Sequence, residues 1–307
     1  MRLLPSIFLP PTSPALADGR VRRRRLGSPQ RWRASLRLAL AAFSCAAVSM
    51  TGVLVAPSAS SATSAPRPVR VMFIGDSVGM WLDLAMSSAG WATHYGVVTS
   101  WDGTILCGLV ADQAVYYRGS RNEALATCRT SPPPGTVTLP ETWAAGVTTF
   151  KPDVVVIESG RWEVGDVEVA GRTTSIEQPG FRRQVAAALD SAVRISSARG
   201  AHVVLMTAPC YNNGLQADHK PWPADSPRRL AIYNGLVRHV ASTHRSTVTL
   251  VDLHRMLCPG GRYTSTIDGM VVRSPDGIHV LGTAGAFYGP RLWPTIVAAG
   301  RRSHVSP

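Results

Sequence analysis

Acidic residues are scarce in this sequence, and the shortage is concentrated at one end. The 307-residue chain has 19 acidic and 32 basic residues, yet residues 1–62 hold nine arginines and a single acid. The remainder carries 23 basic and 18 acidic residues, so the formal net charge falls from +13 to +5. Because the basic excess belongs to the N-terminal region, the composition argues against nucleic acid as a partner of the main body.

Charge is absent from residues 38–56, an almost unbroken apolar run that follows the arginine-rich residues 20–37. This order is typical of an export signal, and the small residues after it favour cleavage near Ala62. The run is also about long enough to span a bilayer uncut, so a signal anchor with its basic end in the cytoplasm is the alternative. Both alternatives place the body outside the cytoplasm, secreted or anchored, and the true start site stays open.

Cysteine is also scarce, with five residues, of which Cys45 lies in the apolar run. No two of the others show the two-to-four-residue separation of a zinc knuckle, so we expect no metal. An even number in an exported body suggests two disulfides, with three possible pairings. We favour Cys107 with Cys128, which closes a short loop, and Cys210 with Cys258, which we place at adjacent strand ends.

No internal repeat is apparent, and the composition divides the chain into four parts. We predict a basic region with a signal peptide or anchor, a linker, one globular domain and a short tail, at residues 1–62, 63–69, 70–300 and 301–307. We expect the protein to be a monomer.

The globular part alternates strands and helices. We predict strands at residues 70–74, 93–99, 154–157, 203–207 and 247–251, and helices at 78–89, 142–150, 181–199, 227–244 and 283–299. Residues 154–157 are continuously apolar and β-branched, which indicates a central strand buried on both faces. The alternation predicts a three-layer α/β/α fold with a central parallel five-stranded sheet.

Ser77 is the candidate nucleophile, because it follows Gly75 and Asp76 where the first strand turns into a helix. A serine there lies at the carboxyl edge of the sheet, near helix N-terminal amides that can receive a negative oxygen. A simple turn followed by a helix cap explains the same residues. The assignment therefore needs a base elsewhere in the chain.

Asp276 and His279, on a loop before the last helix, can supply that base. The carboxylate can accept a hydrogen bond from one imidazole nitrogen while the other nitrogen faces outward. His254, which follows Asp252, is the second candidate, although its neighbours are more typical of a packed turn.

The motifs Gly75-Asp76-Ser77-Val78 and Asp276-Gly277-Ile278-His279 together resemble the SGNH (GDSL-type) hydrolases. The segments 160–163, 251–253 and 257–260 are similar to the periplasmic SGNH domains of sugar-acylating membrane acyltransferases. The resemblance covers residues 70–298. It implies a flavodoxin-like sheet and a Ser77, His279 and Asp276 triad, and we expect no cofactor.

The resemblance also implies an oxyanion hole formed by the backbone amide of Ser77 and by that of Gly108 or, less surely, Gly103. The family's third motif normally adds an Asn, but this chain has Arg161 and Glu163 around that position and no Asn. Arg161 could contact substrate as a cationic donor, or it could pair with Glu163 and brace the loop. We favour the brace slightly.

We therefore expect an exported serine esterase or O-acyltransferase that acts on acylated cell-envelope carbohydrate, and we expect the acyl group to be acetyl. Hydrolysis and transfer share an acyl-serine, so the residues do not decide between them. No multi-span domain precedes the body, so a partner that loads acyl groups would be a separate membrane acyltransferase. The alternative is a non-catalytic carbohydrate-binding or scaffold protein that keeps the fold.

Overall fold

The computed structural model describes residues 67–302. The apolar run at 38–56, the cleavage position near Ala62, most of the linker and residues 303–307 lie outside this range, and the domain boundaries stay predictions. Within it, no helix combines the length and the apolar character that crossing a membrane requires.

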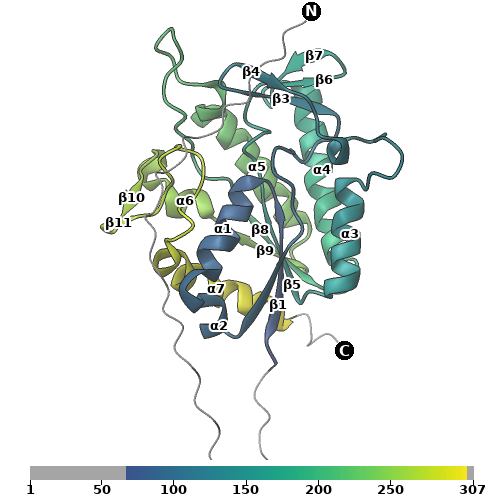
Figure 1. The fold of residues 1–307 in the computed structure, drawn as a ribbon, viewed down its shortest axis with the longest axis vertical. Helices are drawn as coiled ribbons and strands as arrows, with labels where there is room; N and C mark the ends of the chain where they lie inside the picture. The colour runs from purple at the N-terminus through teal and green to yellow at the C-terminus, as the bar shows by residue number, and fades with distance from the viewer. Residues whose placement is uncertain (1–66, 303–307) are drawn as a thin grey trace, which may run out of the picture. The chain divides into compact units, whose positions relative to one another are not determined.

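A central sheet of five parallel strands confirms the predicted fold class (Figure 1). The spatial order is β2-β1-β5-β8-β9. The strand that comes second in the chain, β2, lies at one edge of the sheet, and the other four follow in chain order, as in flavodoxin-like sheets. The bounds are β1 Val69–Gly75, β2 Val97–Trp101, β5 Val154–Glu158, β8 His202–Met206 and β9 Val248–Val251.

Helices cover both faces of this sheet (Figure 1). One face packs against α1 Ser77–Ser87 and α7 Gly285–Arg302, with α2 Trp91–His94 beside them. The opposite face packs against α3 Leu139–Phe150, α4 Pro179–Ser197 and α5 Pro227–Thr243. The shorter helices are α6 Leu253–Leu257, η1 Ser88–Gly90, η2 Ala126–Cys128, η3 Pro223–Asp225 and η4 Pro259–Gly261.

The core explains why β1 and β5 lie at the centre. Residues 71–74 of β1 and 154–157 of β5 are apolar and buried on both faces, which only an interior strand between two helical layers can accommodate. Trp293 of α7 packs edge-on against Phe73 of β1, with ring centroids 6.1 Å apart. Its indole nitrogen donates to the carbonyl of Met86 at 2.9 Å, so one side chain joins α7, β1 and α1.

The second strand begins later than predicted. Residues 91–94 form α2 rather than the start of a strand, and Gly96, with a φ of +64°, redirects the chain into β2. The last helix also begins and ends later, at Gly285 and Arg302. Local propensity indicates these elements, but the turn geometry fixes their ends.

Two small antiparallel sheets were not predicted. One has the order β4-β3-β6-β7 and consists of β3 Gln113–Tyr117, β4 Ser120–Asn122, β6 Val167–Val169 and β7 Arg172–Thr174. The other pairs β10 Thr266–Ile267 with β11 Met270–Val271. Strands of two to five residues are too short for alternation to be recognised. Figure 1 shows the four-stranded sheet near the end of the parallel sheet at which α1 begins.

Gly75 ends β1 in a conformation that only glycine tolerates well. Its φ is +138°, and a Cβ atom there would lie 1.6 Å from the backbone carbonyl oxygen of Glu158 in the adjacent strand. The close approach lets the chain leave β1 and enter α1 directly beside the end of β5. The position of Ser77 therefore depends on this glycine.

We predict that Gly75→Ala lowers the free energy of unfolding by at least about 3 kcal/mol, because strain and a backbone displacement add. Chemical denaturation measures it. Gly90→Ala is the matched control, since its φ is +78° but no atom lies within 4 Å of the new Cβ. That variant should lose only about 1 kcal/mol. Equal losses in the two variants would contradict the close-approach argument.

Candidate active site

Asp76 fixes the start of α1. One carboxylate oxygen accepts from the backbone N–H of Val78 at 2.8 Å, which caps the helix, and the other accepts from the backbone N–H of Arg161 at 3.1 Å. Asp76 is 1% exposed. Burial raises its pKa, although the two hydrogen bonds oppose the rise. Asp76 thus ties the end of β1 to the segment after β5 and holds Ser77 at the first helical position.

Ser77, His279 and Asp276 are brought together, although 202 positions separate Ser77 from His279. The serine Oγ lies 2.8 Å from Nε2 of His279, and Nδ1 of the same ring lies 2.6 Å from a carboxylate oxygen of Asp276. The other oxygen of Asp276 accepts from the backbone N–H groups of Ile278 and His279. Partial burial raises the pKa of Asp276, but these hydrogen bonds outweigh it and the pKa is lowered. The geometry is that of a nucleophile, a base and an orienting carboxylate.

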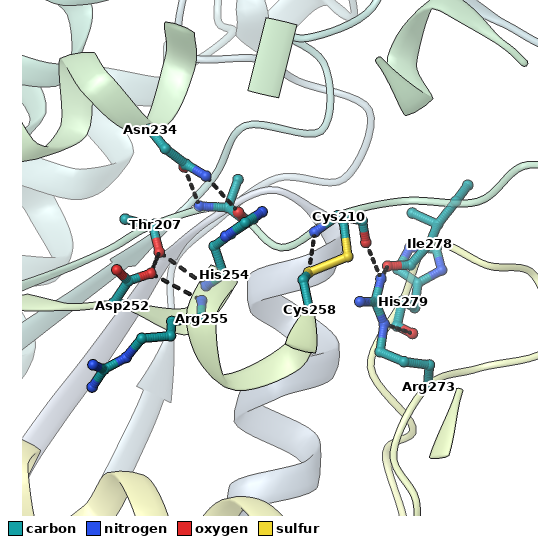
Figure 2. Close-up of a disulfide and its surroundings, with 11 residues drawn as sticks. Thr207, Cys210, Asn234, Asp252, His254, Arg255, Cys258, Arg273, Ile278 and His279 are labelled. Carbon is teal, nitrogen blue, oxygen red and sulfur yellow. Dashed lines mark hydrogen bonds between the residues drawn. A yellow bond between two sulfur atoms is a disulfide. The ribbon is translucent and has the colours of Figure 1, made fainter. Parts of the chain in front are cut away.

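A buried arginine holds the loop that carries His279. Arg273 donates to the carbonyl oxygens of Cys210 at 3.0 Å, Ile278 at 2.7 Å and His279 at 3.3 Å (Figure 2). Because three carbonyls from two segments share one guanidinium, the loop cannot shift without losing several hydrogen bonds. Arg273 was not predicted as a functional residue, because its position three residues before Asp276 is a weak local signal.

Both predicted disulfides are confirmed. Cys107 is joined to Cys128 and Cys210 to Cys258, with Cα atoms 5.8 Å and 6.1 Å apart. Figure 2 shows the second disulfide between α6 and the segment that follows β8. Since Cys210 also supplies a carbonyl to Arg273, this disulfide anchors the support of the His279 loop.

His254, the second candidate base, lies elsewhere. It belongs to α6, where its backbone N–H donates to the hydroxyl of Thr207 at 3.0 Å and where Asp252 caps the helix. Figure 2 shows it on the other side of the Cys210–Cys258 disulfide from His279. The histidine that contacts Ser77 is His279.

The two glycines predicted for the oxyanion hole lie near strand ends. A Cβ atom on Gly103 would lie 2.6 Å from the carbonyl oxygen of Gly75, and one on Gly108 would lie 2.6 Å from a carboxylate oxygen of Glu163. Leu106, which the sequence analysis did not single out, lines the cavity that holds Ser77. The loop therefore reaches the carboxyl edge of the sheet. Which of its amides could receive an oxyanion stays a prediction.

The cavity at Ser77 has a volume of about 250 Å³. Its walls come from α1, β3, the segment after β5 and the His279 loop. The lining residues are Ser77, Leu106, Tyr117, Asn122, Arg161, Trp162, Asp276, Ile278 and His279. A small cavity that combines apolar and aromatic side chains with the polar groups of Ser77 and His279 suits a short acyl group.

Arg161 does not pair with Glu163. Among the ion pairs of residues 67–302 none joins them, so the favoured brace is not formed. Arg161 is 2% exposed, and one of its terminal nitrogens donates to the side-chain oxygen of Asn213 at 3.2 Å. The rings of Tyr117, Trp162 and Tyr211 have centroids 5.2–5.9 Å from its guanidinium carbon. Burial lowers its pKa.

Glu163 lies behind the site instead. One of its oxygens accepts a hydrogen bond from the backbone N–H of Leu109, and the other has no partner within the described part of the chain. Burial, together with the nearby Asp76, raises the pKa of Glu163 to about 7. Glu158 is also fully buried, and burial raises its pKa well above the ordinary value.

The pKa of Glu163 predicts a pH-dependent stability. An acid with a raised pKa in the folded state binds its proton more tightly there than in the unfolded chain. Proton binding by Glu163 therefore stabilises the folded state fully below the ordinary pKa of 4.5, and this stabilisation is lost as the pH rises towards 7. In the wild type, ionisation of Glu163 should lower the free energy of unfolding by about 3 kcal/mol between pH 4 and pH 8. Glu163→Gln cannot ionise, so we expect this part of the decline to be absent from the variant.

Denaturation curves at several pH values measure this effect. Glu123→Gln is the matched control, because Glu123 is an exposed glutamate paired with Arg121. If wild type and Glu163→Gln show parallel pH profiles, Glu163 does not titrate as the geometry indicates.

A family model described as an SGNH domain fused to AT3 domains matches residues 53–293. Among solved structures, the chain is similar to a GDSL-like lipase from Bacteroides thetaiotaomicron, with 13% identity, a TM-score of 0.47, and coverage of 76% of this chain and 93% of that chain. No curated protein matches the chain.

Two further solved structures are similar at comparable levels. The periplasmic domain of a lipopolysaccharide acetyltransferase from Salmonella ser. Paratyphi A has 11% identity and a TM-score of 0.46, with 75% of this chain and 84% of that chain covered. A carbohydrate acetylesterase from Sinorhizobium meliloti has 13% identity and a TM-score of 0.46, with 75% and 99% covered.

Proposed function

Since the chain belongs to the family of SGNH domains fused to AT3 domains, we propose that it is a serine esterase or O-acyltransferase with Ser77 as the nucleophile. The observation that carries the proposal is the continuous hydrogen-bond chain from Ser77 through His279 to Asp276. A hydroxyl, an imidazole and a carboxylate in this order are what acyl transfer through serine requires.

In the first step, His279 Nε2 takes the proton of Ser77 as Oγ attacks the ester carbonyl. The carbonyl π electrons move to its oxygen and form a tetrahedral intermediate. When this collapses, the bond to the leaving sugar oxygen breaks and His279 returns the proton to that oxygen. The acyl group then remains on Ser77. Asp276 holds the imidazole through Nδ1 and stabilises its protonated form.

In the second step, an oxygen nucleophile attacks the acyl-serine and gives its proton to His279, and Ser77 leaves with that proton. Water as the nucleophile makes the protein an esterase, and a sugar hydroxyl makes it a transferase. We propose that the backbone amide of Ser77, in the first turn of α1, is one donor to the intermediate oxyanion, because helix N-terminal N–H groups favour negative charge.

The proposed substrate class is acylated cell-envelope carbohydrate, with acetyl as the proposed acyl group, since domains of this family are joined to AT3 acyltransferase domains. A separate membrane acyltransferase is the proposed source of the acyl group where transfer occurs. The two disulfides are consistent with a location outside the cytoplasm.

We predict that an alkyl fluorophosphonate forms one adduct with the wild-type protein and none with Ser77→Ala, as measured by intact mass. Ser87→Ala, on the same helix, is the control and should react like the wild type. A protein that forms no adduct at all would instead support the non-catalytic carbohydrate-binding or scaffold function.

We also predict that Asp276→Asn lowers kcat for p-nitrophenyl acetate by about 10³–10⁴-fold, because the amide cannot stabilise the imidazolium or fix its tautomer. Asp268→Asn, on an exposed aspartate paired with Arg291, should leave kcat unchanged. Following an isotope-labelled acetyl group from donor to water or to an added oligosaccharide then separates esterase from transferase. A kcat for Asp276→Asn within tenfold of wild type would remove Asp276 from the proposed triad.

A further inference from the structure

A second cavity of about 240 Å³ lies beside the first. Arg161 lines both, and β3 runs between them. Tyr117 lines the cavity of Ser77, whereas its neighbour Tyr116 lines the second one, as expected for side chains that alternate along a strand. Arg118, which also lines the second cavity, lies in the turn between β3 and β4. The second cavity is therefore adjacent to the reaction centre without being part of it.

The shared wall carries a positive charge with no carboxylate partner. Nη2 of Arg161 donates to Asn213, and its Nε and Nη1 have no hydrogen-bond partner among residues 67–302. Asp225 and Asp76 act on this charge without forming an ion pair with it, and Asp76 accepts two backbone hydrogen bonds. Asp225 accepts from the backbone and side-chain N–H groups of Asn213, and Asp166, which lines the cavity, pairs with Arg229 at 2.8 Å. A buried cation without a counterion is costly, so an anion from a ligand would stabilise it.

The remaining walls suit a sugar. Arg118 adds a second cation, and Trp222 provides a flat apolar ring. An aromatic ring offers a broad apolar surface to the C–H face of a pyranose. The volume is below the usual range of drug-sized ligand sites, about 300–1,000 Å³, and suits one small unit.

We propose that the second cavity is a subsite for an acidic sugar, a uronic-acid-like unit whose carboxylate contacts Arg161 and Arg118 while its ring lies on Trp222. This unit would adjoin the acyl-bearing sugar in the cavity of Ser77, so the inference rests on the proposed function. The acidic unit would then select the glycan on which the acyl group is cleaved or placed.

Binding of methyl β-D-glucuronide and methyl β-D-glucoside, measured by isothermal titration calorimetry or NMR, tests the subsite directly. The wild type should bind the glucuronide about tenfold more tightly, because a charge-assisted hydrogen bond is gained. Arg161→Gln should abolish this preference, and Arg118→Gln should reduce it about threefold. Trp222→Ala should weaken the binding of both glycosides alike.

Arg228→Gln is the matched control, since Arg228 is exposed and pairs with Glu177 outside the cavity. It should keep the wild-type preference. If Arg161→Gln does not fold, the binding data of Arg118→Gln and Trp222→Ala test the proposed subsite. Equal affinity of the wild type for the two glycosides, or an undiminished tenfold preference in Arg118→Gln, would overturn the proposal.

The subsite and the proposed function fail in different ways. Sugar binding needs no chemistry at Ser77, so the Ser77→Ala protein should show the same preference. A protein with the preference but no fluorophosphonate adduct would keep the subsite and lose the esterase function. A protein that forms the adduct but shows no preference would lose the subsite alone.

Discussion

The two hydrogen bonds of Asp76 are the constraint on which the rest of the site depends. One caps α1 and the other holds the backbone of Arg161, so a single carboxylate links the ends of the first and third strands of the parallel sheet. Gly75 allows this link because the chain passes against the carbonyl of Glu158 without a side chain between them. Ser77 therefore takes its position from two buried strands rather than from a mobile loop.

The fold and the pairing of distant motifs could be predicted because they leave local marks. The apolar residues of β5 indicate a central strand, and the residues around Ser77 and His279 form recognisable motifs. The four-stranded antiparallel sheet has no such sequence pattern, since its strands have only three to five residues. Yet it supplies Tyr116 and Tyr117, which line the two cavities.

The prediction from the sequence paired Arg161 with the wrong partner. Glu163, two residues away, is the obvious candidate in the sequence. The structure turns Glu163 towards Leu109 and directs Arg161 to Asn213, which is 52 residues further along the chain. Asn213 lies in the loop after β8, another strand that ends at this edge. Sequence proximity is a weak guide to ion pairing where several strand ends converge.

The buried charges behind the site are not equivalent, and the difference shows where a ligand charge is needed. Glu158 and Glu163 can become neutral by binding a proton, which is what their raised pKa values describe. Arginine has no such route, because its guanidinium stays protonated in proteins. Arg273 donates to three carbonyl oxygens and has one nitrogen without a partner in the described residues, whereas Arg161 donates to one amide oxygen and has two such nitrogens. Of these two arginines, Arg161 has the fewer hydrogen-bond partners, and it lies on the wall between the two cavities.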